Sequence, residues 1–153
     1  MKKIYAVLLF LAWIIPVTAE EKKMSAGLGL EWNMESRHNF AGGALLTFDY
    51  QLPRFASVGF FLAGISNFNN THIIEPAFVF RAYQREYEFA GPFFQSELGI
   101  SFIVEDEELT RLPLVGFGAG YRFLLGSSLY VEPYGRIGYP FVFGLGVIGG
   151  IRF

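Results

Sequence analysis

The sequence of 153 residues predicts an all-β fold, an eight-stranded antiparallel up-and-down barrel. The first observation is that apolar residues occupy every second position in one segment after another, as in strands, whose successive side chains point to opposite faces. The second is that 18 phenylalanines accompany 18 glycines, which is typical of β structure with crowded backbone sites. The third is a bulky apolar strand at the C-terminus, which would be an adhesive edge unless the first strand pairs with it.

The first 19 residues form a separate unit. Lys2 and Lys3 precede a continuous apolar run over residues 4–15, which Pro16 ends. Ala19 follows as a small residue of the kind that precedes a cleavage site. This run is shorter than the ~20 residues that a membrane-spanning helix needs. We therefore expect residues 1–19 to be a secretory signal peptide and residues 20–153 to form the barrel domain.

Eight segments of the barrel domain have the pattern of strands, and all alternate except residues 56–65, which are apolar on both phases. We expect strands at residues 24–34, 40–52, 56–65, 72–83, 94–104, 115–123, 129–139 and 141–153. The most charged connection, residues 105–111, is expected to be a loop. Pro76 and Pro133 each remove a ladder hydrogen bond, so we expect a bulge or a strand end at these prolines.

The final strand illustrates the two faces of the predicted sheet. One face is bulky and apolar and consists of Phe141, Phe143, Leu145, Val147, Ile151 and Phe153. The other face contains mainly glycines and ends in Arg152. Alternation alone does not say which face is inside, and a secreted lipocalin-like barrel would place its apolar face inward.

The composition of the polar face decides between these arrangements. A face in contact with water should carry many Lys, Glu, Thr and Ser residues, whereas this face is rich in glycine and has no lysine. Small residues alternating with large ones suit the narrow interior of an eight-stranded barrel. On the apolar face, Ser96 is nearly the only polar residue. We therefore predict a transmembrane barrel whose apolar face contacts hydrocarbon, because strands of about 9–11 residues cross a bilayer.

The predicted interior contains five acids and four arginines. Buried charges must be paired, and planar guanidinium groups suit carboxylates. We predict an interior charge network that fills the barrel, and the fourth and seventh strands support it because each places two charges on one face. Its members are Glu31, Asp49, Glu75, Arg81, Glu97, Arg122, Glu132, Arg136 and Arg152.

The predicted leader, the eight alternating strands, the charged interior and the terminal Phe153 resemble the small eight-stranded outer-membrane β-barrels, of the OmpA transmembrane-domain, OmpX and OmpW type. The resemblance implies the bacterial outer membrane, a periplasmic C-terminus and contact with outer-membrane lipids. It also implies that the barrel-assembly machinery reads Ile151 and Phe153 during insertion, although Ile148 stands where that family has a glycine.

Three sequence patterns suggest other functions, namely nucleotide binding, catalysis and calcium binding. Residues 144–149 read G-x-G-x-x-G, but no helix can follow them, so nucleotide binding is not expected. His38, with Glu35 and Ser36, suggests the alternative hypothesis of a lipid A-modifying enzyme with its site at the outer rim of the barrel. The deacylases of that class carry serine two residues after histidine, whereas Ser36 comes two before it, and His72 has no serine nearby. The acidic residues 105–108 lack the ligand spacing of a calcium loop. We interpret all of these polar residues as solvated.

The function that we expect is structural, in a surface-exposed outer-membrane barrel with a filled interior and no catalysis. The alternatives are a narrow conduit for small apolar solutes, as in OmpW-like barrels, and adhesion through the outer loops. No cofactor or metal is implied, and a net charge of -2 gives no reason to expect nucleic acid as a partner. We expect a monomer. Trp32, Tyr50, Tyr121 and Tyr139 are expected to form interfacial aromatic belts.

Overall fold

The computed structural model describes residues 22–35, 40–67, 70–84, 89–106 and 108–153. Within these ranges, no helix is long and apolar enough to cross a bilayer. The predicted leader at residues 1–19 lies outside the described residues. The strands are β1 (Met24–Glu35), β2 (Phe40–Gln51), β3 (Ala56–Ser66), β4 (Thr71–Tyr83), β5 (Gly91–Glu105), β6 (Glu108–Leu125), β7 (Leu129–Tyr139) and β8 (Phe141–Arg152).

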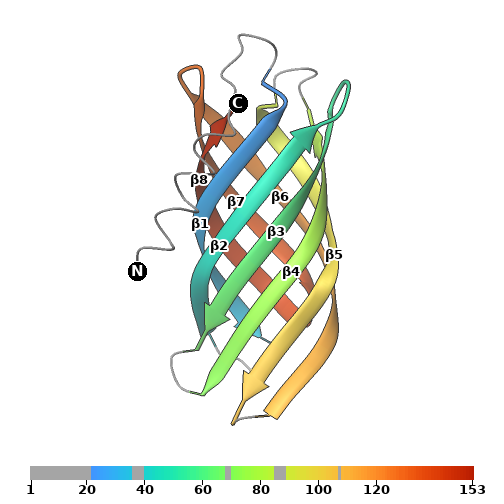
Figure 1. Cartoon of the computed structure of the whole chain (residues 1–153), viewed down its shortest axis with the longest axis vertical. Coiled ribbons are helices and arrows are strands. Elements are labelled where there is room, and N and C mark those ends of the chain that lie inside the picture. Colours follow the sequence, from blue (N-terminus) through green and yellow to red (C-terminus); the bar gives the residue numbers. More distant parts are fainter. Residues whose placement is uncertain (1–21, 36–39, 68–69, 85–88, 107) are drawn as a thin grey trace, which may run out of the picture.

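The strands form one closed barrel in which each strand pairs antiparallel with its neighbours in sequence (Figure 1). β8 pairs with β1 and closes the barrel, and two backbone hydrogen bonds of 2.9 Å join Met24 to Phe153. The predicted fold class is therefore confirmed. β1 begins and β8 ends at the same end of the barrel, uppermost in Figure 1 and called the terminal end below. The opposite end is called the loop end.

The connection between β5 and β6 differs from the prediction. A charged loop was expected at residues 105–111, but Glu105 pairs with Glu108 and Phe102 pairs with Arg111. The pairing of β6 with β7 begins only at Val115. The start of β6 therefore projects with β5 beyond the end of β7, at the bottom of Figure 1. Charged residues can occupy both faces of the strands here because the projecting hairpin lies beyond the apolar barrel wall.

The two prolines are accommodated by gaps in single ladders rather than by bulges or strand ends. Between β4 and β5, the pairs Ile74–Phe102 and Ala77–Gly99 flank Pro76, which has no partner on β5. The β6–β7 ladder is likewise interrupted opposite Pro133. Both ladders resume in the same register, so the missing proline N–H groups leave the barrel closed.

The prediction for Phe141 was wrong. It was placed on the outward face with Phe143, but its side chain is buried inside the barrel. The β1–β8 register shifts between Met34 and Glu35, so that Met34 faces Phe143 and Glu35 faces Phe141. This irregularity turns the first residue of β8 inward, and the expected alternation starts at Phe143.

Candidate functional site

The barrel interior contains the charged residues that the sequence singled out. Eight of these nine side chains belong to residues that are at most 3% exposed, and Arg152 at the terminal end is only partly buried. The eight come from six strands, because each contributes the alternate positions that point to the axis. They are Glu31, Asp49, Glu75, Arg81, Glu97, Arg122, Glu132 and Arg136.

The first group, called the Arg136 cluster, contains one arginine and three glutamates. Arg136 Nη2 lies 2.5 Å from Glu31 Oε1 and 2.7 Å from Glu75 Oε2, and Nη1 lies 2.8 Å from Glu97 Oε2. Arg136 Nε also donates to Glu31 Oε1 at 3.0 Å. A single planar guanidinium therefore joins β1, β4, β5 and β7 across the barrel.

Neutral hydroxyl groups complete the Arg136 cluster. The Tyr134 hydroxyl donates to Glu31, and Ser101 Oγ donates to Glu75 Oε1 at 3.2 Å. A Cβ atom at Gly146 would lie 2.5 Å from the Tyr134 ring. The glycine of β8 thus leaves the space that Tyr134 occupies, which explains in part why the inward face is rich in glycine.

The second group, called the paired-arginine cluster, contains two arginines and two acids. Asp49 Oδ2 lies 2.7 Å from Arg81 Nη1 and 3.2 Å from Arg122 Nη2. Glu132 lies 2.5 Å from Arg122 Nε and 3.4 Å from Arg81 Nη2. Each carboxylate therefore contacts both arginines, and the formal charges of this cluster balance.

Gln95 connects the two clusters. Its Oε1 accepts a hydrogen bond from Arg81 Nε at 3.0 Å, and its Nε2 donates to Glu97 Oε1 at 2.5 Å. Ser25 adds a further link, because its hydroxyl donates to Asp49 and accepts from Arg122, both at 3.2 Å. The interior is consequently one continuous polar network.

Aromatic rings pack against the arginines. The Arg136 guanidinium carbon lies 4.0 Å from the centre of the Phe141 ring and 4.9 Å from that of Phe61. The Arg122 guanidinium carbon lies 4.1 Å from the Tyr130 ring centre and 4.4 Å from that of Phe89. Such contacts stabilise a desolvated cation, and the inward turn of Phe141 supplies one of them.

Apolar side chains cover the network at both ends of the barrel. At the loop end, the buried residues include Ile65 of β3, Ile73 of β4, Leu114 of β6 and Phe141 of β8. At the terminal end, Tyr83, Phe89, Phe93 and Tyr130 are buried, and the Tyr83 ring centre lies 5.1 Å from Phe89 and 5.6 Å from Phe93. The described interior is therefore filled with packed side chains.

The outer wall has the opposite character. The side chains that point outward along all eight strands are mostly large and apolar, such as Leu30, Phe78, Phe94, Leu98 and Phe117, and they are exposed. Trp32 and Tyr139 are exposed toward the loop end, and Tyr50 and Tyr121 toward the terminal end. Along the barrel wall, large apolar side chains thus face outward and the ion pairs face inward, which is the arrangement that suits an apolar surrounding.

The remaining candidates do not form a reactive site among the described residues. His38 and Ser36 lie outside the described residues, and His72 is exposed on β4. Glu105, Asp106 and Glu108 are exposed at the β5–β6 turn, and Asp106 accepts a hydrogen bond from Asn70. In the described part of the chain, no group of three or more His, Cys, Asp or Glu residues could hold a metal ion. The glycine motif at 144–149 lies within β8, paired on both sides.

Sequence reasoning did not single out Ser25, Gln95, Ser101 and Tyr134 as members of the network. Their signal was available, because each lies on the same alternating phase as the charges of its strand. The predicted network contained charged residues alone, so these neutral polar residues were not among its members. The pairing of particular acids with particular arginines could not be read from spacing, since Glu31 and Arg136 meet from β1 and β7, on either side of β8.

Solved structures that share this fold include two bacterial barrels. The N-terminal β-barrel domain of OprF from Pseudomonas aeruginosa is 11% identical, with a TM-score of 0.58 over 84% of this chain and 97% of that chain. Neisserial surface protein A is 10% identical, with a TM-score of 0.60 over 84% of this chain and 94% of that chain. At such low identity the likeness establishes the fold alone. No protein-family model and no curated protein matches the sequence.

Proposed function

We propose that this chain is a structural β-barrel of the bacterial outer membrane with a filled interior and no catalytic role. The observation that supports this function best is the inversion of polarity, in which the same strands bury ion pairs and expose large apolar side chains. An apolar exterior of this kind is stable in lipid and would aggregate in water. The interfacial positions of Trp32, Tyr50, Tyr121 and Tyr139 agree with a membrane crossing between them.

The filled interior supports a structural role rather than transport. Ions and solutes would have to displace the Arg136 cluster and the paired-arginine cluster, and breaking one buried ion pair costs about 3–5 kcal/mol. The protein should migrate differently on gels before and after boiling, and should give no stepwise conductance in planar bilayers. Steady conductance would favour the narrow conduit instead, and a barrel that stays monomeric in water without detergent would contradict membrane insertion.

We place the terminal end in the periplasm and the loop end at the cell surface, following the topology of the small outer-membrane barrels. The projecting β5–β6 hairpin, with exposed Glu105, Asp106 and Arg111, suits an aqueous surface. Because the chain has no cysteine, Asp106→Cys should react with a membrane-impermeant maleimide on intact cells, whereas Ser127→Cys should not. The reverse labelling pattern would invert the proposed orientation.

The C-terminal residues are proposed to guide assembly. Phe153 pairs with Met24 through backbone atoms, so truncating its side chain leaves these hydrogen bonds possible. Phe153→Ala should therefore lower the amount of barrel assembled in cells while refolding into detergent remains normal. An equal loss in both settings would indicate a purely structural role for Phe153, and the same comparison applies to Ile151.

A further inference from the structure

The Arg136 cluster contains more acids than cations. The guanidinium of Arg136 serves three carboxylates at distances of 2.5 to 2.8 Å. These carboxylates belong to Glu31, Glu75 and Glu97, and each of the four side chains is at most 2% exposed. Fully ionised, the cluster would have a formal charge of -2. An excess of charge without water or a counter-ion is costly in a protein interior.

The strands around the cluster supply no second cation. β1, β4 and β5 each contribute one glutamate, and β7 contributes Tyr134 and Arg136. Among the described side chains, β2, β3, β6 and β8 contribute no titratable group to the cluster. The other inward titratable side chains described within the barrel wall lie toward the terminal end, where four of them form the charge-balanced paired-arginine cluster. They are Asp49, Arg81, Arg122 and Glu132 of that cluster, with Tyr83, Tyr130 and Arg152.

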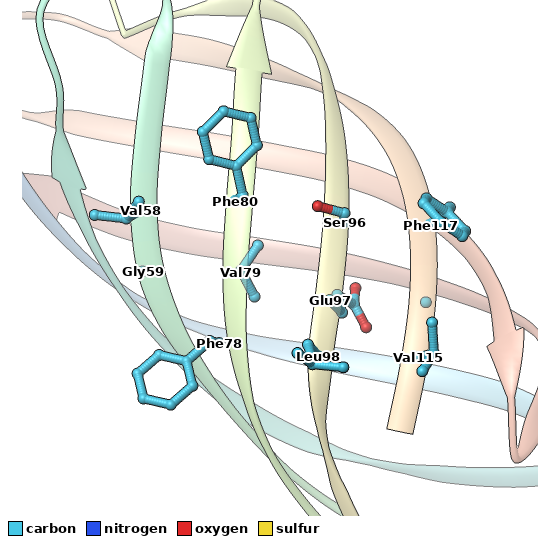
Figure 2. Close-up of a pocket in the computed structure, with 11 residues that line it drawn as sticks. Val58, Gly59, Phe78, Val79, Phe80, Ser96, Glu97, Leu98, Val115 and Phe117 are labelled. Carbon is cyan, nitrogen blue, oxygen red and sulfur yellow. The ribbon is translucent and has the colours of Figure 1, made fainter. Parts of the chain in front are cut away.

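The outer wall beside the cluster offers no cation either. Figure 2 shows this wall around Glu97, where Phe78, Leu98 and Phe117 are exposed on the outer face. A shallow groove of about 380 Å³ indents the wall here, and none of the described residues that line it is cationic. The three carboxylates therefore have Arg136 as their shared counter-ion, and the remaining charge needs another form of compensation.

Hydrogen-bond partners determine which carboxyl group can carry a proton. Glu97 accepts from Arg136 through one oxygen and from the Gln95 NH₂ group through the other, and neither partner can accept in return. The orientation of Gln95 is fixed, because its oxygen accepts from Arg81 Nε at 3.0 Å. A proton on Glu97 would thus face a donor at either oxygen, so Glu97 remains a carboxylate.

Glu31 and Glu75 have partners of a different kind. One oxygen of Glu31 contacts the Tyr134 hydroxyl, and one oxygen of Glu75 contacts the Ser101 hydroxyl at 3.2 Å. A hydroxyl group can accept a hydrogen bond as well as donate one, so either carboxyl group can be protonated and stay hydrogen-bonded. Their other oxygens contact the same atom, Arg136 Nη2. Two carboxyl groups that share one site favour keeping a proton between them.

We propose that the Arg136 cluster binds one proton at neutral pH, shared by Glu31 and Glu75. The proton lowers the formal charge of the cluster to -1. With partly buried Arg152 included, the five acids and four arginines of the interior network then balance. The inference depends on the burial of the cluster, which the barrel has in detergent and in lipid alike. Its failure would therefore leave the proposed membrane location intact.

Infrared spectroscopy detects the proton directly, because the carbonyl band of a protonated carboxyl group is separate from the bands of a carboxylate. The folded barrel should show this band at neutral pH in a detergent without ester groups. Glu75→Gln and Glu31→Gln should each abolish it, since either change gives the cluster the same charge without a proton. Glu105→Gln is the matched control at an exposed position and should keep the band. Absence of the band in the unmodified protein, or its persistence in either interior variant, would overturn the proposal.

The pH dependence of stability gives a second readout. Glutamates of the unfolded chain lose their protons at about pH 4.3, so above that pH the folded barrel binds one proton more than the unfolded chain. Stability should therefore fall as pH rises. Relative to Glu75→Gln, the unfolding equilibrium constant should increase about tenfold per pH unit until the cluster releases its proton.

Urea titration in vesicles from about pH 5 to about pH 9 measures this difference. Groups outside the cluster titrate equally in the unmodified protein and in Glu75→Gln, so the comparison isolates the shared proton. The same pH dependence in both proteins would contradict the proposal. Heat-modifiable migration of each variant shows that the barrel is folded, which separates loss of the proton from loss of the fold.

Discussion

The interior and the outer wall of this barrel are made from alternate residues of the same eight strands, yet they depend on different physics. Inside, each charge is held by directed contacts, as where Arg136 contacts three glutamates at 2.5 to 2.8 Å. Outside, apolar side chains such as Phe78 and Leu98 need only an apolar surrounding. The interior should therefore be sensitive to the loss of a single partner, and the outer wall to the gain of a single charge.

The two interior clusters refine this comparison. The paired-arginine cluster has as many cations as acids, so removing one arginine still leaves the other in contact with Asp49 and Glu132. In the Arg136 cluster, one cation serves three acids. If Arg136 is removed, no second arginine contacts these three carboxylates among the described residues.

The largest effect is expected from Arg136→Met, which leaves the carboxylates of Glu31, Glu75 and Glu97 buried without their shared cation. Breaking a buried ion pair by removing one partner destabilises by about 3–5 kcal/mol. The free energy of unfolding can be measured by urea titration in vesicles, with Trp32 fluorescence as the signal. Arg152→Met is the control and should cost less than about 1 kcal/mol, because Arg152 is partly exposed. Equal losses would show that ion pairing does not govern the interior.

Phe78→Arg tests the outer wall and should have the next largest effect. Phe78 lies near the middle of β4 and is 74% exposed. An arginine facing the middle of a bilayer costs about 2–4 kcal/mol, so insertion into vesicles should be blocked or strongly slowed. Phe78→Leu keeps the apolar character and should insert normally. If Phe78→Arg inserts as well as Phe78→Leu, the outward face does not contact hydrocarbon.

Alternation was sufficient to predict the eight-stranded fold, because a single period-two pattern serves both faces, and the charges then indicated which face points inward. The phase of β4 is fixed by Glu75 and Arg81 together, and that of β7 by Glu132 and Arg136. Features that depend on pairing between strands could not be predicted. The inward turn of Phe141 comes from a register shift on β1.

The β5–β6 hairpin was missed for a different reason. Charges at residues 105–111 were interpreted as a loop, yet strand pairing continues through Leu109 and Arg111. A charged residue argues against a strand only where its side chain would face hydrocarbon, and the projecting hairpin extends past Tyr139, the last residue of β7. The charges at residues 105–111 therefore mark the end of the apolar wall, whereas the strands continue beyond it.

Glu97→Gln should have a moderate effect of about 1 kcal/mol, the value of a typical hydrogen bond. Glu97 accepts from Arg136 through one oxygen and from Gln95 Nε2 through the other. A glutamine can keep only one of these contacts, because its NH₂ group would face that of Gln95. Urea titration in vesicles measures the loss, and a loss as large as that of Arg136→Met would contradict the primacy of the shared cation.

Glu75→Gln should have the smallest effect, below about 1 kcal/mol, because a glutamine can keep both of the hydrogen bonds that Glu75 makes. Glu75 accepts from Arg136 through one oxygen and from the Ser101 hydroxyl through the other. The hydroxyl can rotate and accept from a glutamine NH₂ group, and Arg136 retains Glu31 and Glu97. Glu75→Gln and Glu97→Gln remove the same charge from the same cluster but differ in the group that faces the amide. If both variants lose the same unfolding free energy, charge number governs the cluster; if Glu97→Gln loses more, hydrogen-bond geometry does.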